Sequence, residues 1–75
     1  KGISMVRDRK VAAHEIELDG KIMPMQVVSI REGRVADIYP LDGEMAGTEW
    51  LGGRIEIRKT SDSSLIAYKD NKRIE

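Results

Sequence analysis

Apolar and polar residues alternate with a period of two along much of this chain, and turn dipeptides interrupt the alternation. In the run 10–18 the even positions carry Ala12, His14, Ile16 and Leu18, and the later odd positions are glutamates. This pattern is typical of a strand with one buried and one solvent-exposed face, so it places His14 inward. The Asp-Gly pair at 19–20 favours a two-residue hairpin turn, because both residues tolerate a positive φ.

The run 21–31 predicts a second strand that is apolar on both faces. Its apolar positions divide into Met23, Met25 and Val27 on one face and Ile22, Val28 and Ile30 on the other. Such a strand is either central in its sheet or covered on its second side. Pro24 removes one ladder donor, which indicates a sheet edge or a bulge. We therefore expect the first half of the strand at an edge and the second half buried.

Later segments predict further short strands. Glu32-Gly33 forms a second turn before a strand at 34–41, in which the spacing of Val35 and Ile38 indicates a twist or bulge. Residues 42–48 have the composition of a loop with room for one helical turn. The runs 54–58 and 65–68 are short strands, and Asp70-Asn71 favours one more turn, into a last strand or a frayed tail.

These segments together predict a single all-β domain spanning residues 1–75. The expected architecture is an antiparallel meander of about five strands that curls into a sandwich or a partly open barrel. Lys1–Ser4 precede Met5 and are set aside, as either a cloning remnant or the trimmed end of a longer N-terminus.

Size and cysteine content limit how this domain is stabilised. A chain of 75 residues buries only about 60% of the surface that its unfolded form exposes, so its core is thin. There is no cysteine, which excludes disulfides and thiolate metal sites. Association with another protein is the remaining common aid to stability in so small a domain. We expect no cofactor.

Charge and hydropathy argue against two classes of partner. The 13 basic residues are balanced by 13 acidic ones, whereas nucleic-acid-binding domains normally carry a basic surplus. Only Trp50, Tyr39 and Tyr68 are aromatic, too few for a base-stacking platform. No apolar run reaches the ~20 residues that cross a bilayer. We therefore expect neither nucleic acid nor a membrane as partner, and a cytoplasmic location.

Residues 10–41 run in the order strand, Asp-Gly turn, strand, Gly-Arg-Val-x-x-Ile and proline. The residues that carry this pattern are Val28, Ile30, Gly33, Arg34, Val35, Ile38 and Pro40. The segment resembles the small N-terminal β-domain, or composite domain, of the amidohydrolase superfamily. The resemblance implies an accessory β-domain without the catalytic barrel. The family's metal ligands have no counterpart here, because residues 50–57 contain no His-x-His pair and a catalytic barrel needs at least ~200 residues.

The titratable residues do not assemble into a recognisable catalytic or metal site. His14 is the only histidine, and one histidine provides neither a triad nor a ligand set, so we expect a structural role. Asp42, Glu44 and Glu49 gather around the loop. Carboxylates bind hard cations, but without the spacing of a known cation loop we expect them to be solvated.

Two stretches are candidates for an interaction surface. Trp50 lies close to Gly52 and Gly53, which forms either an aromatic anchor beside an open backbone or a plug at one end of a small barrel. We favour the plug. Met23 and Met25, with Val27 beyond them and Met45 in the loop, offer an adaptable apolar face. The alternative for that strand is burial on both sides within the monomer.

Three hypotheses for function follow. The first is a non-catalytic interaction or structural module that self-associates or binds a protein partner; its candidate surface comprises Met23, Met25, Val27, Trp50, Gly52 and Gly53. The second is an accessory domain of a separately encoded amidohydrolase-like enzyme. The third is a barrel that binds a small molecule through Trp50, His14 and the loop acids. An independent enzyme ranks last.

Overall fold

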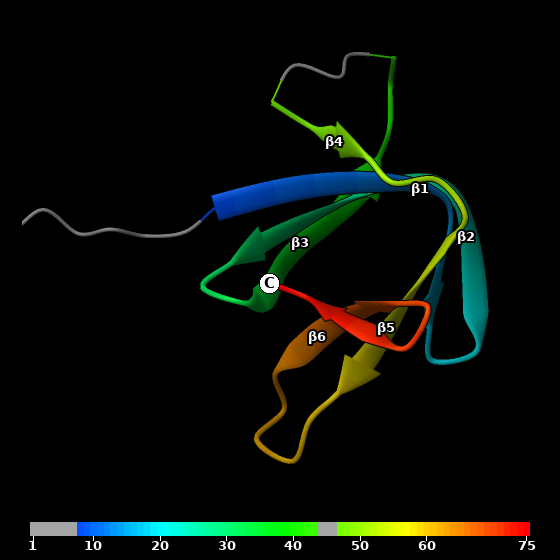
Figure 1. Ribbon diagram of the computed structural model, residues 1–75. Helices are drawn as coiled ribbons and strands as arrows, with labels where there is room; N and C mark the ends of the chain where they lie inside the picture. Colours follow the sequence, from blue (N-terminus) through cyan, green and yellow to red (C-terminus); the bar gives the residue numbers. More distant parts are fainter. Residues whose placement is uncertain (1–7, 44–46) are drawn as a thin grey trace, which may run out of the picture.

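The computed structural model describes residues 8–43 and 47–75, and it confirms the all-β class. In these residues seven strands follow one another: β1 (Asp8–Leu18), β2 (Lys21–Arg31), β3 (Arg34–Pro40), β4 (Glu49–Trp50), β5 (Arg54–Lys59), β6 (Leu65–Lys69) and β7 (Lys72–Ile74). They form one sheet in the order β3-β2-β1-β5-β6-β7, with β4 also paired to β1 (Figure 1). Lys1–Ser4, Glu44 and Met45 lie outside the described residues.

Three tight turns shape the sheet, and all three were predicted. Asp19-Gly20 has φ values of 53° and 77°, Glu32-Gly33 of 53° and 80°, and Asp70-Asn71 of 53° and 64°. Positive φ at both central residues is the signature of the type I′ turn, whose twist matches that of the strands it joins.

The sheet consists of two antiparallel meanders joined by parallel strands. β1, β2 and β3 form the first meander, and β5, β6 and β7 form the second. β5 and β4 both run parallel to β1, which the antiparallel expectation did not include. Parallel pairing requires a long connection, and the number of residues between the end of β3 at Pro40 and the start of β5 at Arg54 is sufficient for one.

The two irregularities predicted for β2 and β3 are present. β2 pairs with β1 along its length, but it pairs with β3 only over 26–31, so the half that contains Pro24 is an edge. The register between β2 and β3 shifts at Ser29 and Ile30, whose partners Asp37 and Val35 leave Ala36 as the extra residue of a bulge.

The core lies on the concave side of this curled sheet. It consists of buried aliphatic residues from both meanders: Val11, Ala13, Ile16, Val28, Ile30, Ile55, Ile57, Ala67 and Ile74. The curl brings β3 beside β6 (Figure 1), but these two strands are not neighbours in the hydrogen-bonded order of the described sheet, so it does not close into a barrel.

The inward and outward faces exchange partway along the β1–β2 hairpin. Met25 has a left-handed backbone with φ of 50°, and beyond it Met23 packs against the core while Ile22 is 47% exposed. The two continuous faces predicted for β2 are therefore wrong. On β1, Ala13 and Ile16 both face the core and His14 is exposed, so its predicted inward orientation is also wrong. Strict alternation fails here because the positive φ of Met25 interrupts the extended backbone. The side chains on its two sides therefore no longer follow one alternating pattern.

Candidate interaction surface

Trp50 and His14 form an aromatic pair on the surface of the sheet. The two rings meet edge to face, with centroids 4.9 Å apart and planes at 79°. Trp50 is 42% exposed, so the interpretation of Trp50 as a plug at the end of a barrel is wrong. A large aromatic ring that is held by a neighbour and still exposed loses little conformational freedom when it binds a partner.

The segment after Trp50 is fixed along β1 by three hydrogen bonds. The Leu51 N–H donates to the Ala12 carbonyl (2.8 Å), and the Glu15 N–H donates to the Gly53 carbonyl (3.1 Å). The Gly53 N–H donates to Nδ1 of His14 (3.0 Å). The histidine therefore contacts both the indole ring and the backbone that follows it.

Gly52 and Gly53 allow this close approach. Both have a positive φ, 71° and 63°, a conformation that glycine adopts without steric cost. Gly52 is buried under the aromatic pair: a β-carbon there would lie 3.6 Å from Trp50 Nε1 and 3.7 Å from His14 Cε1. The glycines and Trp50, which the sequence predicted to act together, are in contact: Gly52 packs beneath the rings of Trp50 and His14.

A second apolar layer lies on the face of the sheet that carries Trp50. Trp50 pairs with Ala12, Ala12 with Val27, and Val27 with Tyr39, so the four side chains form one row across β4, β1, β2 and β3. Ala12 and Val27 are 0% and 2% exposed although neither belongs to the main core cluster. Val27 therefore contributes to this layer and is not available as part of a binding surface.

We define the Trp50 surface as Trp50, His14 and Met25. In the β1–β2 register His14 falls between Ala13 and Glu15, whose partners are Gln26 and Pro24, so Met25 lies opposite His14. Met25 is 43% exposed. Of the predicted surface residues, Trp50, Met25 and Gly53 are exposed on this part of the sheet, while Met23 and Gly52 are partly or fully buried. The sequence grouped His14 with Trp50 only in the small-molecule hypothesis, and it was left out of the interaction surface because alternation placed it inward.

The edge of β2 is protected against the addition of another strand. Lys21 follows a two-residue turn, so its backbone N–H and C=O groups point toward β1. These groups point alternately toward and away from β1 along the strand, so those of Ile22 and Pro24 point away from it. Pro24 has no N–H to offer, and its carbonyl accepts a hydrogen bond from Nε2 of Gln26 (3.1 Å). Proline and local capping are common ways of protecting a sheet edge.

The outer edge of β3 is protected in the same way. By the same count the backbone nitrogens of Val35, Ile38 and Pro40 point outward. The Ile38 N–H donates to Oδ1 of Asp37 (2.9 Å), and Pro40 has no N–H. Strand addition at the edges of β2 and β3 is therefore disfavoured.

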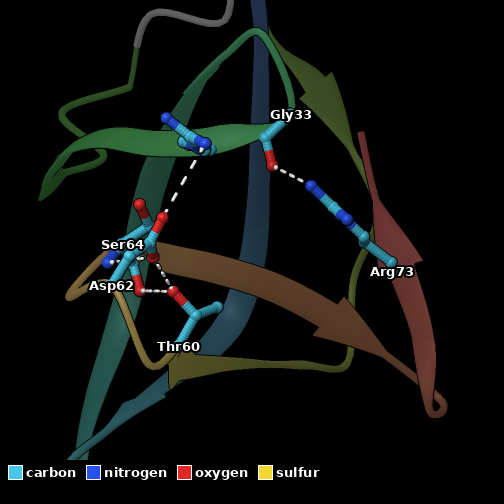
Figure 2. A network of polar contacts seen from close by, with 6 residues as sticks. Gly33, Thr60, Asp62, Ser64 and Arg73 are labelled. Carbon is cyan, nitrogen blue, oxygen red and sulfur yellow. Dashed lines mark hydrogen bonds and ion pairs between the residues drawn. The ribbon is translucent and has the colours of Figure 1, made fainter.

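Polar side chains bridge the gap between the two ends of the sheet (Figure 2). Arg73 Nη2 donates to the Gly33 carbonyl (3.3 Å), and Arg34 Nη2 lies 3.9 Å from Oδ2 of Asp62. The pKa of Asp62 lies below its ordinary value, chiefly because the Thr60 hydroxyl donates to its carboxylate. The bridge leaves an open polar hollow of about 280 Å³. These contacts hold the curled sheet in shape without closing it.

Of the three loop acids singled out in the sequence, Glu44 lies outside the described residues and Glu49 pairs with an arginine. Nε and Nη2 of Arg9 donate to the two carboxylate oxygens of Glu49, both at 3.1 Å. The pKa of Glu49 is lowered, first of all by this hydrogen bonding with Arg9. Glu49 therefore anchors β4 to β1. Within residues 8–43 and 47–75, no three histidine or acidic side chains gather closely enough to hold a metal ion.

Comparisons with known protein families, characterised proteins and solved structures found no match to this chain. The resemblance of residues 10–41 to the amidohydrolase N-terminal domain therefore stays a prediction. In the part of the chain that the structure describes, no helix has the length and apolar character to cross a membrane.

Proposed function

We propose that this domain is a non-catalytic protein-interaction module that self-associates through the Trp50 surface. The observation that carries the proposal is the exposed, ordered aromatic pair of Trp50 and His14 on a sheet whose β2 and β3 edges are protected. Tryptophan is the side chain most enriched among the residues that dominate binding energy at protein interfaces. The cysteine-free sequence suits a reducing compartment such as the cytoplasm.

The pairing of charges supports a binding role. Arg9 holds Glu49, Arg54 holds Glu15 (3.0 Å) and Arg58 holds Glu56 (2.9 Å). Each of these arginines contacts a carboxylate on its own or a neighbouring strand, which is the arrangement of groups that support a sheet. The apolar side chains of Trp50 and Met25, in contrast, remain largely exposed to solvent. Exposed apolar side chains that lie together often mark a binding surface.

A second copy of the chain is the partner that the composition favours. Because 13 basic residues balance 13 acidic ones, two copies approach without net repulsion. A stable interface buries about 800 Å² on each partner, roughly one sixth of the 5143 Å² surface of this domain. Burial on that scale also supplements the thin core of a 75-residue chain.

Molar mass measured by light scattering after size-exclusion chromatography, over a tenfold concentration range, tests this proposal. We expect a mass above the 8.4 kDa of one chain. The 42% of Trp50 that is exposed is about 100 Å² of a ~250 Å² side chain, or about 2.5 kcal/mol of binding per copy. Trp50→Ala should therefore weaken association by one to two orders of magnitude per copy.

The matched control is Ile22→Ala, which removes an equally exposed apolar side chain (47%) from the hairpin end of β2. It should leave the molar mass unchanged. A mass of one chain at every concentration, or equal effects of the two substitutions, would refute self-association through the Trp50 surface.

A further inference from the structure

The hydrogen bond between His14 and Gly53 exists for one protonation state only. An imidazole nitrogen accepts a hydrogen bond only when it carries no proton, so the contact from Gly53 N–H to Nδ1 (3.0 Å) requires a neutral ring with its proton on Nε2. Histidine is the side chain that ordinarily changes charge between about pH 5 and 8. His14 is the only histidine in the chain.

This bond is the one titratable attachment among the three that hold the segment 51–53 to β1. The bond from Leu51 to Ala12 and the bond from Glu15 to Gly53 join backbone groups, which do not change charge in this range. The Trp50 ring, which directly precedes the segment, contacts the same imidazole that accepts the third bond. Protonation of His14 therefore alters the support of the indole and of the backbone together.

The charged groups around His14 do not compensate for its protonation. On β1 the carboxylate of Glu15 is held by Arg54 of β5 at 3.0 Å. On β6 the ammonium of Lys69 lies against Gly53, 3.4 Å from where a β-carbon would stand, and it also contacts Asp70 at 3.3 Å. The carboxylate nearest His14 in the chain is thus already paired with an arginine, and the cation of Lys69 lies against the backbone that His14 fixes.

Among the described residues, the two remaining neighbouring strands, β4 and β2, add no free carboxylate. On β4, Glu49 is bound by both ends of the Arg9 guanidinium. On β2, residues 24–26, which lie opposite His14, are Pro, Met and Gln and carry no charge. Protonation therefore removes an acceptor without creating a compensating ion pair.

We propose that His14 is a pH-sensitive latch for the Trp50 surface. The neutral imidazole fixes Gly53 and packs against Trp50; the protonated form cannot accept from Gly53, so the segment 51–53 loosens and Trp50 loses its support. The regulation of binding by this latch rests on the proposed self-association, while the latch itself does not. Acidification therefore weakens self-association.

The latch is tested by following the Gly53 amide in ¹H–¹⁵N NMR spectra between about pH 8 and 5, at a concentration where the protein is monomeric. Loss of the hydrogen bond should shift the Gly53 amide resonance upfield with a single transition, and the fluorescence of Trp50 should change over the same range. His14→Asn is the matched variant, because its side-chain oxygen can accept from Gly53 but does not titrate. In His14→Asn, both signals should stay flat, and the Gly53 shift should lie close to that of the wild type at high pH.

A flat Gly53 shift in the wild type, or the same transition in His14→Asn, would overturn the latch. The consequence for binding is measured separately, as the dissociation constant from light scattering at both pH values. We expect it to rise about tenfold on acidification in the wild type and to stay constant in His14→Asn. A wild type that is monomeric at both pH values refutes the proposed function, whereas the Gly53 shift still decides the latch. A protein that associates equally at both pH values overturns the regulation by His14.

Discussion

The parallel contact between β1 and β5 predicts an unequal response to two substitutions of the same residue type. Ile55 and its register partner Ile16 are both completely buried, and they join the two meanders at the centre of the core. Truncating a buried isoleucine to alanine costs about 2–5 kcal/mol, because transfer free energy is lost and a cavity remains. A domain of this size has a total stability of about 4–11 kcal/mol, at 0.05–0.15 kcal/mol per residue. Ile55→Ala should therefore remove a large part of the stability.

The matched control is Ile22→Ala, at a position that is 47% exposed, which should cost less than about 1 kcal/mol. Urea unfolding followed by far-ultraviolet circular dichroism measures both losses. If the Ile55→Ala loss is about 3 kcal/mol, the thermal midpoint should fall by roughly 12–24 °C. Equal losses for the two variants, or a loss below about 1 kcal/mol for Ile55→Ala, would refute the placement of the β1–β5 contact in the core.

Three further outcomes are expected. Met25→Val should destabilise the domain by about 1–2 kcal/mol in urea unfolding, because a β-branched side chain disfavours the left-handed backbone at φ 50°, whereas Met25→Gly should be tolerated better. Arg9 lowers the pKa of Glu49 below its ordinary 4.5, so this pair stabilises the fold above pH 4.5 and its contribution is lost as the pH falls through the lowered pKa. Arg9→Ala should therefore move the pKa of Glu49, measured by NMR titration of its carboxyl group, back toward 4.5. Pro24→Val restores an outward N–H on β2 and should increase the molar mass in light scattering; an unchanged mass would contradict a protective role for this proline.

The sequence was sufficient to predict most strands and turns because these depend on local chemistry. The pairs Asp19-Gly20 and Glu32-Gly33 tolerate positive φ, and Pro24 lacks an N–H wherever it lies, so the turns and the edge followed directly. The parallel direction of pairing between β1 and β5 could not be predicted from the sequence. Alternation defines which face a residue occupies, and it carries no information on the orientation of the neighbouring strand.

The candidate surface was predicted in part for a related reason. Trp50 stood out as the single tryptophan beside two glycines, and its proximity to those glycines is present in the structure. The contribution of His14 depends on the exchange of faces near Met25, whose positive φ occurs at a residue type that rarely adopts it. A methionine gives no local signal for this conformation, so the methionine face predicted from strict alternation could not be corrected from sequence alone.

The parallel pairing of β1 with β5 also affects the order in which the strands of this domain fold. The two-residue turns bring neighbouring strands together over a few residues, and hairpins of this kind form in about 1–10 μs. Glu15 and Arg54, in contrast, meet across 39 residues of chain. Closing such a loop costs entropy before any contact offsets it, so pairing of β1 with β5 should be the slow step of folding. Substitutions at Ile55 should then slow refolding, while substitutions in the turn at 70–71 should mainly accelerate unfolding.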